Sequence, residues 1–414
     1  MTAAAITHAA SVALTGSSAW RVTRTTVKRQ SSLHWLQPPS DPVLNVTVLT
    51  TDADFDSLQR DWEDLLENSD QQVFFLRWHW VRSWWRFYAP APADGRLLLV
   101  ACRDAGGRLI GLAPLYEERR RFLGLRLVRE VRFLGTGDLR ISEHVDIIAR
   151  RGSEAQVGRA VAECLRRSIA WDRLLLWSVP ATSTVFPHFR DALGPGVTIL
   201  VTDRAYIVDT SGDWEQTKRG FRHDLDRALR SLWRNGTHDT RVQTMEELQP
   251  ALDDLIHLHQ ARWMAKGQPG SFSYPGFEAF LREAAADSLA RGRLGLWRLM
   301  IDGQCAAALI GFVDFGTVHY FQSGFDPDSP HSLGRVIVGV AIRDSVAATG
   351  VRRFDLMGGE AGYKVDWTAD TLESLELECL SGARGMLFKV LRAARDRLAR
   401  ARRAVRRRLR SRST

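Results

Sequence analysis

The stretch FDLMGGEAGYKVDW, residues Phe354 to Trp367, decides how this chain is interpreted. Its apolar start is typical of a buried strand, and the paired glycines mark the end of that strand. The run that follows contains Glu360, Tyr363 and Lys364, which are residue types that a core segment would not carry. We therefore expect a functional site at the end of this strand.

Length and composition limit the class of protein. The chain has 414 residues, 45% of them hydrophobic, which predicts two domains and tails. Its four cysteines are widely spaced, which argues against a disulfide framework and a zinc site. No apolar run approaches the roughly 20 residues of a membrane-spanning helix, and the N-terminus lacks the basic region of a secretory signal. We expect a cytoplasmic protein without a metal site.

The two ends of the chain differ from its body. Residues 1–40 contain no acidic residue and are rich in Ala, Ser and Thr, which predicts disorder. Residues 384–414 hold 13 Lys or Arg residues against one acid, so their balance of +12 exceeds the +9 of the whole chain and leaves −3 for the rest. The high pI therefore describes a tail and does not indicate a nucleic-acid-binding core.

The same tail carries an apolar stripe. Apolar residues recur there at steps of three and four, at Leu387, Leu391, Ala394, Leu398, Ala401, Val405 and Leu409. This pattern predicts a basic amphipathic helix, peripheral at the inner face of a membrane. Nucleic acid is a competing partner, because arginines bind any phosphate. A solvated or coiled-coil tail is a further alternative.

Two parts of the sequence share one plan. GRLLLVACRDAGGRLIGLAPLY, from Gly95, and GRLGLWRLMIDGQCAAALIGFV, from Gly292, each predict two strands joined by a glycine turn. A helix and a buried strand follow each hairpin. Helical patterns precede them, at 56–67 and 78–88 in the first half and at 249–264 and 277–290 in the second. The order predicts a duplicated α/β or α+β layer fold.

A loop before one helix can bind an anion. The loop 326–334, DPDSPHSLG, connects a predicted strand at 317–325 to a predicted helix at 335–349. Free backbone N–H groups and the positive end of a helix dipole suit a phosphate or pyrophosphate. An ordinary capped turn is the competing interpretation.

Together these motifs resemble the GNAT superfamily of acyl-CoA acyltransferases. The specific likeness is to its duplicated branch, which includes CelD-type cellulose-biosynthesis proteins and Fem-type aminoacyl transferases. The residues that carry it are Phe354, Asp355, Gly359, Tyr363, Lys364 and Trp367, with Ser329, Pro330, Leu333 and Gly334 in the loop. The likeness covers about residues 45–380. The usual glycine-rich pyrophosphate loop is reduced to HSLGRV, which weakens the case for strong acetyl-CoA binding.

The resemblance implies two tandem GNAT-like domains, each a mixed twisted sheet flanked by helices, followed by the basic amphipathic helix. The implied ranges are 41–205 for an acceptor-side domain, 206–383 for the catalytic domain and 384–414 for the tail. Acetyl-CoA or another acyl-CoA is the implied co-substrate, placed between the strand segments 319–325 and 352–359. Residues expected to contact it are Phe325, Ser332, Leu333, Gly334 and Arg335.

Catalytic roles are predicted for three residues after the strand. Tyr363 can protonate the departing thiolate, Lys364 can neutralise a phosphate or oxyanion, and Glu360 is favoured as base or substrate anchor. Asp355 is expected to be structural and tied to a neighbouring arginine. Strand alternation sets His319 and Tyr320 on opposite faces, so only one of them is expected to face the site.

Substrate contacts are predicted outside this motif as well. The helical pattern 218–236 places basic residues, with Arg222 and His223 foremost, where they can grip CoA phosphates or an anionic glycan. A solvated helix face is the alternative. His319 and Trp367 complete the predicted substrate-binding set.

The sequence thus predicts an acyltransferase that acylates an amine or hydroxyl of a sugar, lipid or envelope precursor, in the context of polysaccharide or cellulose biosynthesis. Two rivals stay open. One is a Fem-type enzyme that takes its acyl group from aminoacyl-tRNA, and the other is a non-catalytic accessory protein of polysaccharide synthesis, which would have a plugged cleft.

Overall fold

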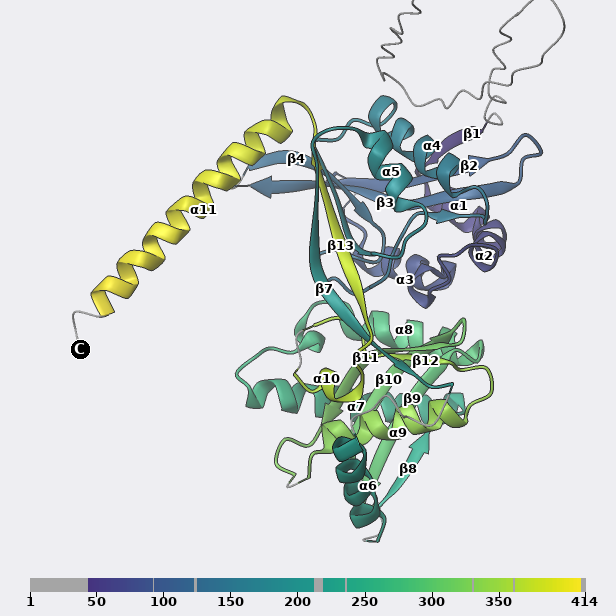
Figure 1. Ribbon diagram of the computed structural model, residues 1–414, viewed down its shortest axis with the longest axis vertical. Coiled ribbons are helices and arrows are strands. Elements are labelled where there is room, and N and C mark those ends of the chain that lie inside the picture. Colours follow the sequence, from purple (N-terminus) through teal and green to yellow (C-terminus); the bar gives the residue numbers. More distant parts are fainter. Residues whose placement is uncertain are drawn as a thin grey trace, which may run out of the picture. The chain divides into compact units, whose positions relative to one another are not determined.

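The computed structural model describes residues 44–91, 93–122, 125–211, 219–234, 237–329, 331–359 and 362–410 (Figure 1). The predicted disordered segment, residues 1–40, lies outside these ranges. Residues Leu44–Thr414 form one compact unit. The predicted mixed α/β architecture is confirmed, because helices flank a sheet that has both parallel and antiparallel strands.

The first half alternates helices and strands in the predicted order. Its elements are β1 (Asn45–Leu49), α1 (Asp52–Ser57), α2 (Gln59–Glu67), the 3-10 turn η1 (Phe74–Leu76), α3 (Trp78–Tyr88), β2 (Gly95–Arg103), β3 (Leu109–Phe122), β4 (Leu125–Phe133), β5 (Ile148–Ala149), α4 (Glu154–Arg167), β6 (Arg173–Pro180), α5 (Phe186–Leu193) and β7 (Val197–Asp209). The hairpin predicted from Gly95 is β2 and β3, which pair antiparallel.

The second half repeats that plan. Its elements are α6 (Arg219–Arg234), β8 (His238–Arg241), α7 (Met245–Ala265), the 3-10 turn η2 (Ser271–Ser273), α8 (Phe277–Ala290), β9 (Leu294–Ile301), β10 (Gln304–Asp314), β11 (Thr317–Phe325), α9 (Leu333–Ala347), β12 (Arg353–Asp355), α10 (Lys364–Trp367), β13 (Thr371–Leu380) and α11 (Gly382–Arg410). The second predicted hairpin, β9 and β10, is also antiparallel.

One sheet runs through both halves. Its strands lie in the order β1-β2-β3-β4-β6-β13-β7-β12-β11-β10-β9-β8, and β5 pairs with β3 beside this path. The predicted boundary at 205/206 falls inside β7, which pairs with β13 up to Tyr206 and with β12 from Ile207 onward. The strand β13 is the last strand of the second half in sequence, yet it pairs with β6 and β7. The two halves therefore exchange a strand.

Helices cover both faces of the second half's strands. Along β10, Ala307 and Leu309 face a core cluster that includes α6 and α9 residues, while Ala308 and Ile310 face a cluster that includes α7 and α8 residues. This alternation is the period-two pattern of a strand covered on both sides. The arrangement fixes the ends of β11 and β12, where the predicted site lies.

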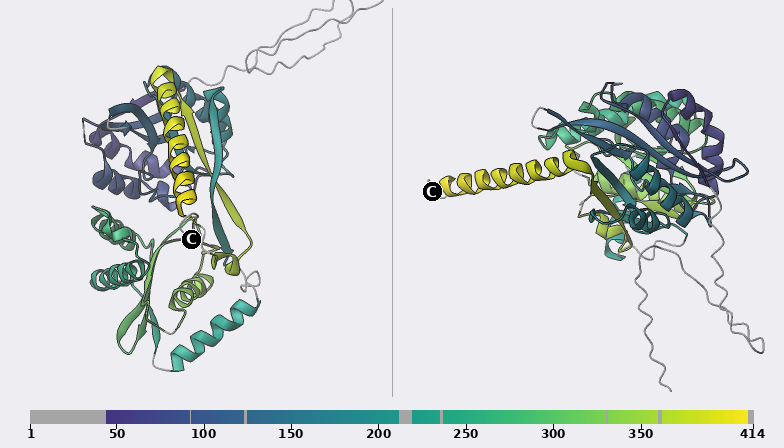
Figure 2. Two further views of the ribbon diagram at one scale, coloured as in Figure 1. Left: turned by 90° about the vertical axis from the view of Figure 1, so that its left-hand side faces the viewer. Right: turned by 90° about the horizontal axis from the view of Figure 1, so that it is seen from above.

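The predicted C-terminal helix is present as α11, which Figure 2 shows as one straight helix. Its first turns are held to the sheet, since Phe388 is buried against Val128 and Arg392 forms ion pairs with Glu378. Further along, Leu398 is 62% exposed. Within the described ranges, none of the helices combines the length and apolar character that crossing a membrane requires.

Candidate active site

The strands β11 and β12 diverge at the predicted site. They pair in parallel only from Thr317–His319 to Arg353–Asp355, although β11 continues to Phe325. Beyond His319, β11 no longer pairs with β12, and its residues Ser323 and Phe325 line a cavity together with the loop before α9. The divergence lies where the resemblance places the thioester.

The five residues predicted to contact the cofactor line one cavity. It has a volume of about 290 Å³ and lies at the N-terminus of α9. Its walls include the predicted Phe325, Ser332, Leu333, Gly334 and Arg335, together with Arg262, Ser323 and Tyr363. We call it the α9 cavity. A helix N-terminus with arginines nearby attracts phosphate.

A close contact shapes the α9 cavity. A Cβ atom at Gly334 would lie 2.6 Å from the Phe325 ring, so only glycine allows this ring to rest on the first turn of α9. The Arg262 guanidinium carbon lies 4.7 Å from the centre of the same ring, on its face. The stacking holds one cation at the cavity wall.

Tyr363 is the link between the α9 cavity and the strand end. Burial raises the pKa of its hydroxyl well above the ordinary value, and the neighbouring Tyr320 raises it further. The Tyr320 hydroxyl in turn lies 2.6 Å from the Ser323 hydroxyl. Tyr363 therefore stays protonated at neutral pH, as a proton donor must.

Lys364 holds the turn after β12 closed. Its ammonium donates to the carbonyl of Met357, at 2.9 Å, and to the carbonyl of Gly358. Met357 has a φ of 59°, a left-handed conformation that a side chain disfavours. Burial lowers the pKa of Lys364, against the pull of the carboxylates of Glu143, Asp203 and Asp355. The side chain is thus part of the backbone framework at this site.

A second cavity is lined by this turn and takes residues from both halves. Its volume is about 190 Å³. Its polar lining comprises Arg140, Glu143, Ser271, Tyr274, Tyr320, Gln322 and Lys364. We call it the inter-half cavity, because Arg140 and Glu143 belong to the first half and the others to the second.

Glu143 is the residue that the sequence did not indicate. Its Oε2 accepts a hydrogen bond from the backbone N–H of Gly358 at 2.8 Å. Burial raises the pKa of Glu143, His144 opposes that rise and Asp355 adds to it. A carboxyl with a raised pKa, placed in a cavity beside Lys364, has the properties of a general base. No motif surrounds it in the first half, so only the fold reveals it.

The predicted partner of Asp355 is wrong. Asp355 is buried and structural, as expected, but its carboxylate lies 2.8 Å from His144 Nε2 and 3.5 Å from His319 Nδ1 instead of contacting an arginine. Although burial would raise the pKa of Asp355, His144 lowers it well below the ordinary value. The same pair raises the pKa of His144 despite its burial. The ion pair joins the two halves.

Strict alternation along β11 does not hold. Ile310 pairs with Gln322 and Gly311 with Tyr320, so Phe321 is an extra residue in a β-bulge. Tyr320, Phe321 and Gln322 all line the inter-half cavity as a result. The predicted substrate residue His319 lines a third cavity with His144 and Asp355 instead.

The other predicted residues have different positions. The Trp367 ring is fully buried in the core with Phe354, and a buried ring offers no surface to a substrate. Arg222 and His223 are not among the residues that line the three cavities. They lie on α6, whose Leu225, Leu229 and Leu232 are buried toward α9. Glu360 lies outside the described residues.

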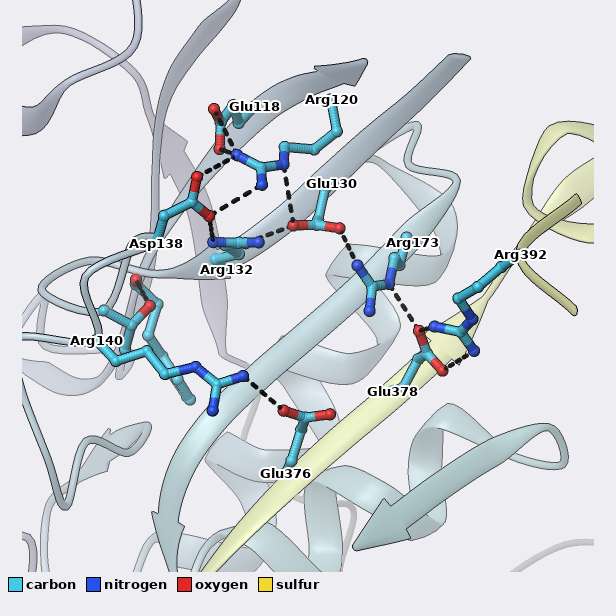
Figure 3. A network of polar contacts seen from close by, with 12 residues as sticks. Glu118, Arg120, Glu130, Arg132, Asp138, Arg140, Arg173, Glu376, Glu378 and Arg392 are labelled. Carbon is cyan, nitrogen blue, oxygen red and sulfur yellow. Dashed lines mark hydrogen bonds and ion pairs between the residues drawn. The ribbon is translucent and has the colours of Figure 1, made fainter. Parts of the chain in front are cut away.

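The matching place in the first half is crossed by ion pairs. The parallel strands β4 and β6 pair only at Glu130–Val131 and Arg173–Leu174. Beside this short ladder, buried Glu130 contacts Arg132 and Arg173, and Glu378 joins Arg173 to Arg392 (Figure 3). Salt bridges here favour a structural role for this part of the first half.

In the part of the chain that the structure describes, no cluster of His, Cys, Asp or Glu side chains is arranged to hold a metal ion.

Comparison with known proteins supports the fold. Residues 219–365 match the family described as an acetyltransferase (GNAT) domain. A putative lysylphosphatidylglycerol synthetase domain from Agrobacterium fabrum has 13% identity and a TM-score of 0.51, over 82% of this chain and 96% of that one. FemX has 9% identity and a TM-score of 0.55, over 77% and 95%. A conserved protein of unknown function from Bacteroides thetaiotaomicron has 12% identity and a TM-score of 0.51, over 81% and 100%.

No match was found among curated protein sequences. The domain match and the shared architecture define an acyltransferase fold of the GNAT type. The second half of the chain therefore contains a domain that matches the GNAT acetyltransferase family.

Proposed function

We propose that the second half transfers an acyl group, with acetyl the first candidate, from a CoA thioester to an amine or hydroxyl of a sugar, lipid or cell-envelope precursor. The observation that carries this proposal is the α9 cavity, where the loop expected to hold pyrophosphate meets Tyr363. Arg262 and Arg335 supply positive charge there, and the end of α9 supplies backbone N–H groups.

The acceptor is assigned to the inter-half cavity. Tyr320 and Gln322 line it, and the next β11 residue, Ser323, lines the α9 cavity, so the two cavities adjoin along one strand. An acceptor in the inter-half cavity reaches the thioester from the side opposite to the CoA phosphates. The first half then contributes Glu143 and Arg140 to acceptor binding.

The proposed reaction includes two proton transfers, and a different residue carries out each of them. The acceptor nitrogen or oxygen attacks the thioester carbonyl carbon, forming a C–N or C–O bond as the C–S bond breaks. Glu143 takes the proton that the acceptor loses, and Tyr363 gives its hydroxyl proton to the CoA thiolate before solvent returns one. Lys364 holds the turn on which these groups depend.

Titration of acetyl-CoA into the protein tests the donor site. Arg335→Ala removes an exposed cation of the α9 cavity and is expected to weaken binding by about tenfold. Arg343→Ala, a change of the same kind near the other end of α9, is the matched control. If the two variants bind acetyl-CoA with equal affinity, the α9 cavity is not the CoA site.

A Fem-type transferase is the second candidate. The fold likeness to FemX supports it at the level of architecture. If the protein binds aminoacyl-tRNA and transfers its acyl group but does not bind acetyl-CoA, aminoacyl-tRNA is the donor in place of CoA. A non-catalytic accessory role is less favoured, because the α9 cavity is open at about 290 Å³ where that role predicts a plugged cleft.

The C-terminal helix is proposed to hold the protein at the inner surface of a membrane. Exposed apolar residues Met386, Leu387, Val390 and Leu398 lie on the helix beside its arginines. Apolar contact and attraction to anionic lipid act together in such helices. An envelope precursor carried by lipid would then be within reach of the site.

A further inference from the structure

The inter-half cavity contains two charged side chains that a ligand can reach. Of the described residues that line it, three carry a charge, namely Arg140, Glu143 and Lys364. Lys364 is only 5% exposed and already donates to two backbone carbonyls. Arg140 is exposed, and Glu143 is only partly buried. The cavity therefore offers one accessible positive group and one accessible negative group to its occupant.

Arg140 has hydrogen-bonding capacity that the protein does not use. Its guanidinium lies over the Trp177 ring, 4.9 Å from the ring centre, and its Nη2 lies 3.6 Å from Glu376 Oε2 (Figure 3). That separation exceeds hydrogen-bond distance, and no described residue accepts a hydrogen bond from this guanidinium. The two contacts hold the planar group in place, while its N–H groups remain available to another anion.

Glu143 has one carboxylate oxygen that is available in the same way. Its Oε2 accepts the hydrogen bond from the N–H of Gly358, and within the described ranges no group donates to its Oε1. Arg140 is not its partner, because Arg140 pairs with Glu376. Burial raises the pKa of Glu143. A cation beside Oε1 would oppose that rise and favour the ionised carboxylate.

One short loop presents both groups. Arg140 has a φ of 50° and His144, next to Glu143, has a φ of 55°, so the loop contains two left-handed residues that are not glycine. The loop is fixed to β6, because Trp177 supports the Arg140 guanidinium and the Ser178 hydroxyl accepts from the N–H of His144 at 3.1 Å. Strained backbone that surrounding contacts hold in place is typical of binding sites. A ligand therefore meets the two groups already in position.

The wall around the two charges is largely apolar. It includes Leu139, Ile141, Phe277 and Leu356. An aliphatic chain suits such a wall, because both are removed from water when the chain binds. Each water occupies about 30 Å³ of liquid, so the cavity of about 190 Å³ has room for several heavy atoms between the two charged groups.

We propose that the acceptor is an acid-bearing amine, whose ammonium group binds Glu143 and whose carboxylate or phosphate binds Arg140. This inference rests on the proposed acyltransferase function, since it names the acceptor of that reaction. The planar fork of a guanidinium matches a carboxylate and a phosphate equally, so the shared chemistry is an anion joined to the amine by a short aliphatic chain. An uncharged hydroxyl acceptor would leave both charged groups without a charged partner.

Three probes test this assignment. γ-Aminobutyrate carries a carboxylate, phosphoethanolamine carries a phosphate, and butylamine has the four-carbon chain of γ-aminobutyrate without the acid. Calorimetric titration without CoA should show at least one acid-bearing probe binding about tenfold or more tighter than butylamine. The tighter of the two acid-bearing probes then identifies the acid. Arg140→Gln should abolish the preference for the acid.

Arg96→Gln is the matched control. The Arg96 side chain is 53% exposed and paired with a glutamate, as is that of Arg140, but it is not among the described residues that line the three cavities. This variant should keep the preference for the acid. Glu143→Gln should weaken the binding of all three probes by a similar factor and keep the preference, because Arg140 is unchanged.

Four results would overturn the inference. They are butylamine binding to the wild-type protein as tightly as both acid-bearing probes, no binding of any probe, a preference that persists in Arg140→Gln, and a preference that is lost in Arg96→Gln. The titrations contain no CoA, so they are separate from the test of the donor site. A protein that binds acetyl-CoA but shows no preference for the acid keeps the transferase proposal and loses this acceptor class. A protein that shows the preference but binds no acetyl-CoA keeps the acceptor site and loses the CoA donor.

Discussion

The carboxylate of Glu143 in the first half accepts a hydrogen bond from the backbone N–H of Gly358 in the second half, at 2.8 Å. A parallel contact joins Asp203 to the N–H of Gly359, at 2.9 Å. Both carboxylates therefore cap the turn that follows β12. Of these two carboxylates, only Glu143 lines the inter-half cavity, where Arg140 of the first half lies as well.

Replacement of Glu143 by Gln should reduce kcat by about 10²- to 10⁴-fold, because the amide cannot accept the acceptor's proton. Since burial raises the pKa of Glu143, the wild-type rate should fall as pH decreases through a value above the ordinary 4.5. The variant should lack this acidic limb. A pH profile of turnover at saturating donor measures both effects.

Asp203→Asn is the matched control for this variant. It disturbs the neighbouring cap of the same turn, and its side chain does not line the inter-half cavity. It should retain the acidic limb. If Glu143→Gln retains the limb as well, another group is the base.

The ion pair between His144 and Asp355 should make stability depend on pH. The pKa of Asp355 is lowered when folded, so its contribution is present above its unfolded value and is lost as pH falls. The pKa of His144 is raised when folded, so its contribution is complete below about pH 6.5 and is lost as pH rises through the folded value. The pair should therefore stabilise most between about pH 4 and 6.5.

Urea unfolding of His144→Gln checks this prediction. At pH 6 the variant should lose about 3–5 kcal/mol, because Asp355 is left buried without its cation. The difference from wild type should shrink as pH rises. His188→Gln, an exposed change of the same kind, should show neither effect. A loss in His144→Gln that stays constant from pH 5 to alkaline conditions would contradict the assignment of charge to this pair.

Lys364 should affect stability as well as activity. From the sequence alone it is expected to act only in chemistry, but its ammonium holds two carbonyls of the turn after β12. Lys364→Met keeps the chain length and removes these bonds, which should cost about 1–3 kcal/mol and abolish turnover. Thermal unfolding measures the first effect. Lys389→Met, on the exposed side of α11, is the control. If Lys364→Met is as stable as the wild-type protein, the turn after β12 does not depend on the hydrogen bonds of the lysine.

Local patterns predicted much of the fold. Apolar periodicity located the helix at 78–88 and the helix at 277–290 to the residue, because amphipathic helices carry their packing face in the sequence. The residues around the α9 loop also came together in one cavity, since they adjoin in sequence and need only one turn to meet. Predictions of this kind depend on neighbours along the chain.

Long-range relationships were beyond the sequence. The place of β13 in the sheet depends on which strand edges it pairs with. The apolar pattern of a single sequence does not distinguish one such edge from another. Glu143 reaches Gly358 across 215 positions with no motif around it. The bulge at Phe321 changed which residues face the cavity, because one extra residue shifts the alternation. Trp367 was misassigned, since an aromatic residue beside a site motif can equally belong to the core.

The last prediction concerns α11 and separates lipid from nucleic acid. Binding to anionic vesicles should disappear when the chain is truncated after Arg395, a cut that keeps the contacts of Phe388 and Arg392 with the sheet. Leu398→Gln removes an exposed apolar group and leaves every charge, so it should weaken vesicle binding while leaving any RNA binding unchanged. Arg397→Gln removes one charge and should weaken both, more at low salt. Sedimentation with vesicles and a filter assay with RNA give the two readouts. If Leu398→Gln binds vesicles like wild type while Arg397→Gln does not, charge alone holds the tail and the apolar face has another partner.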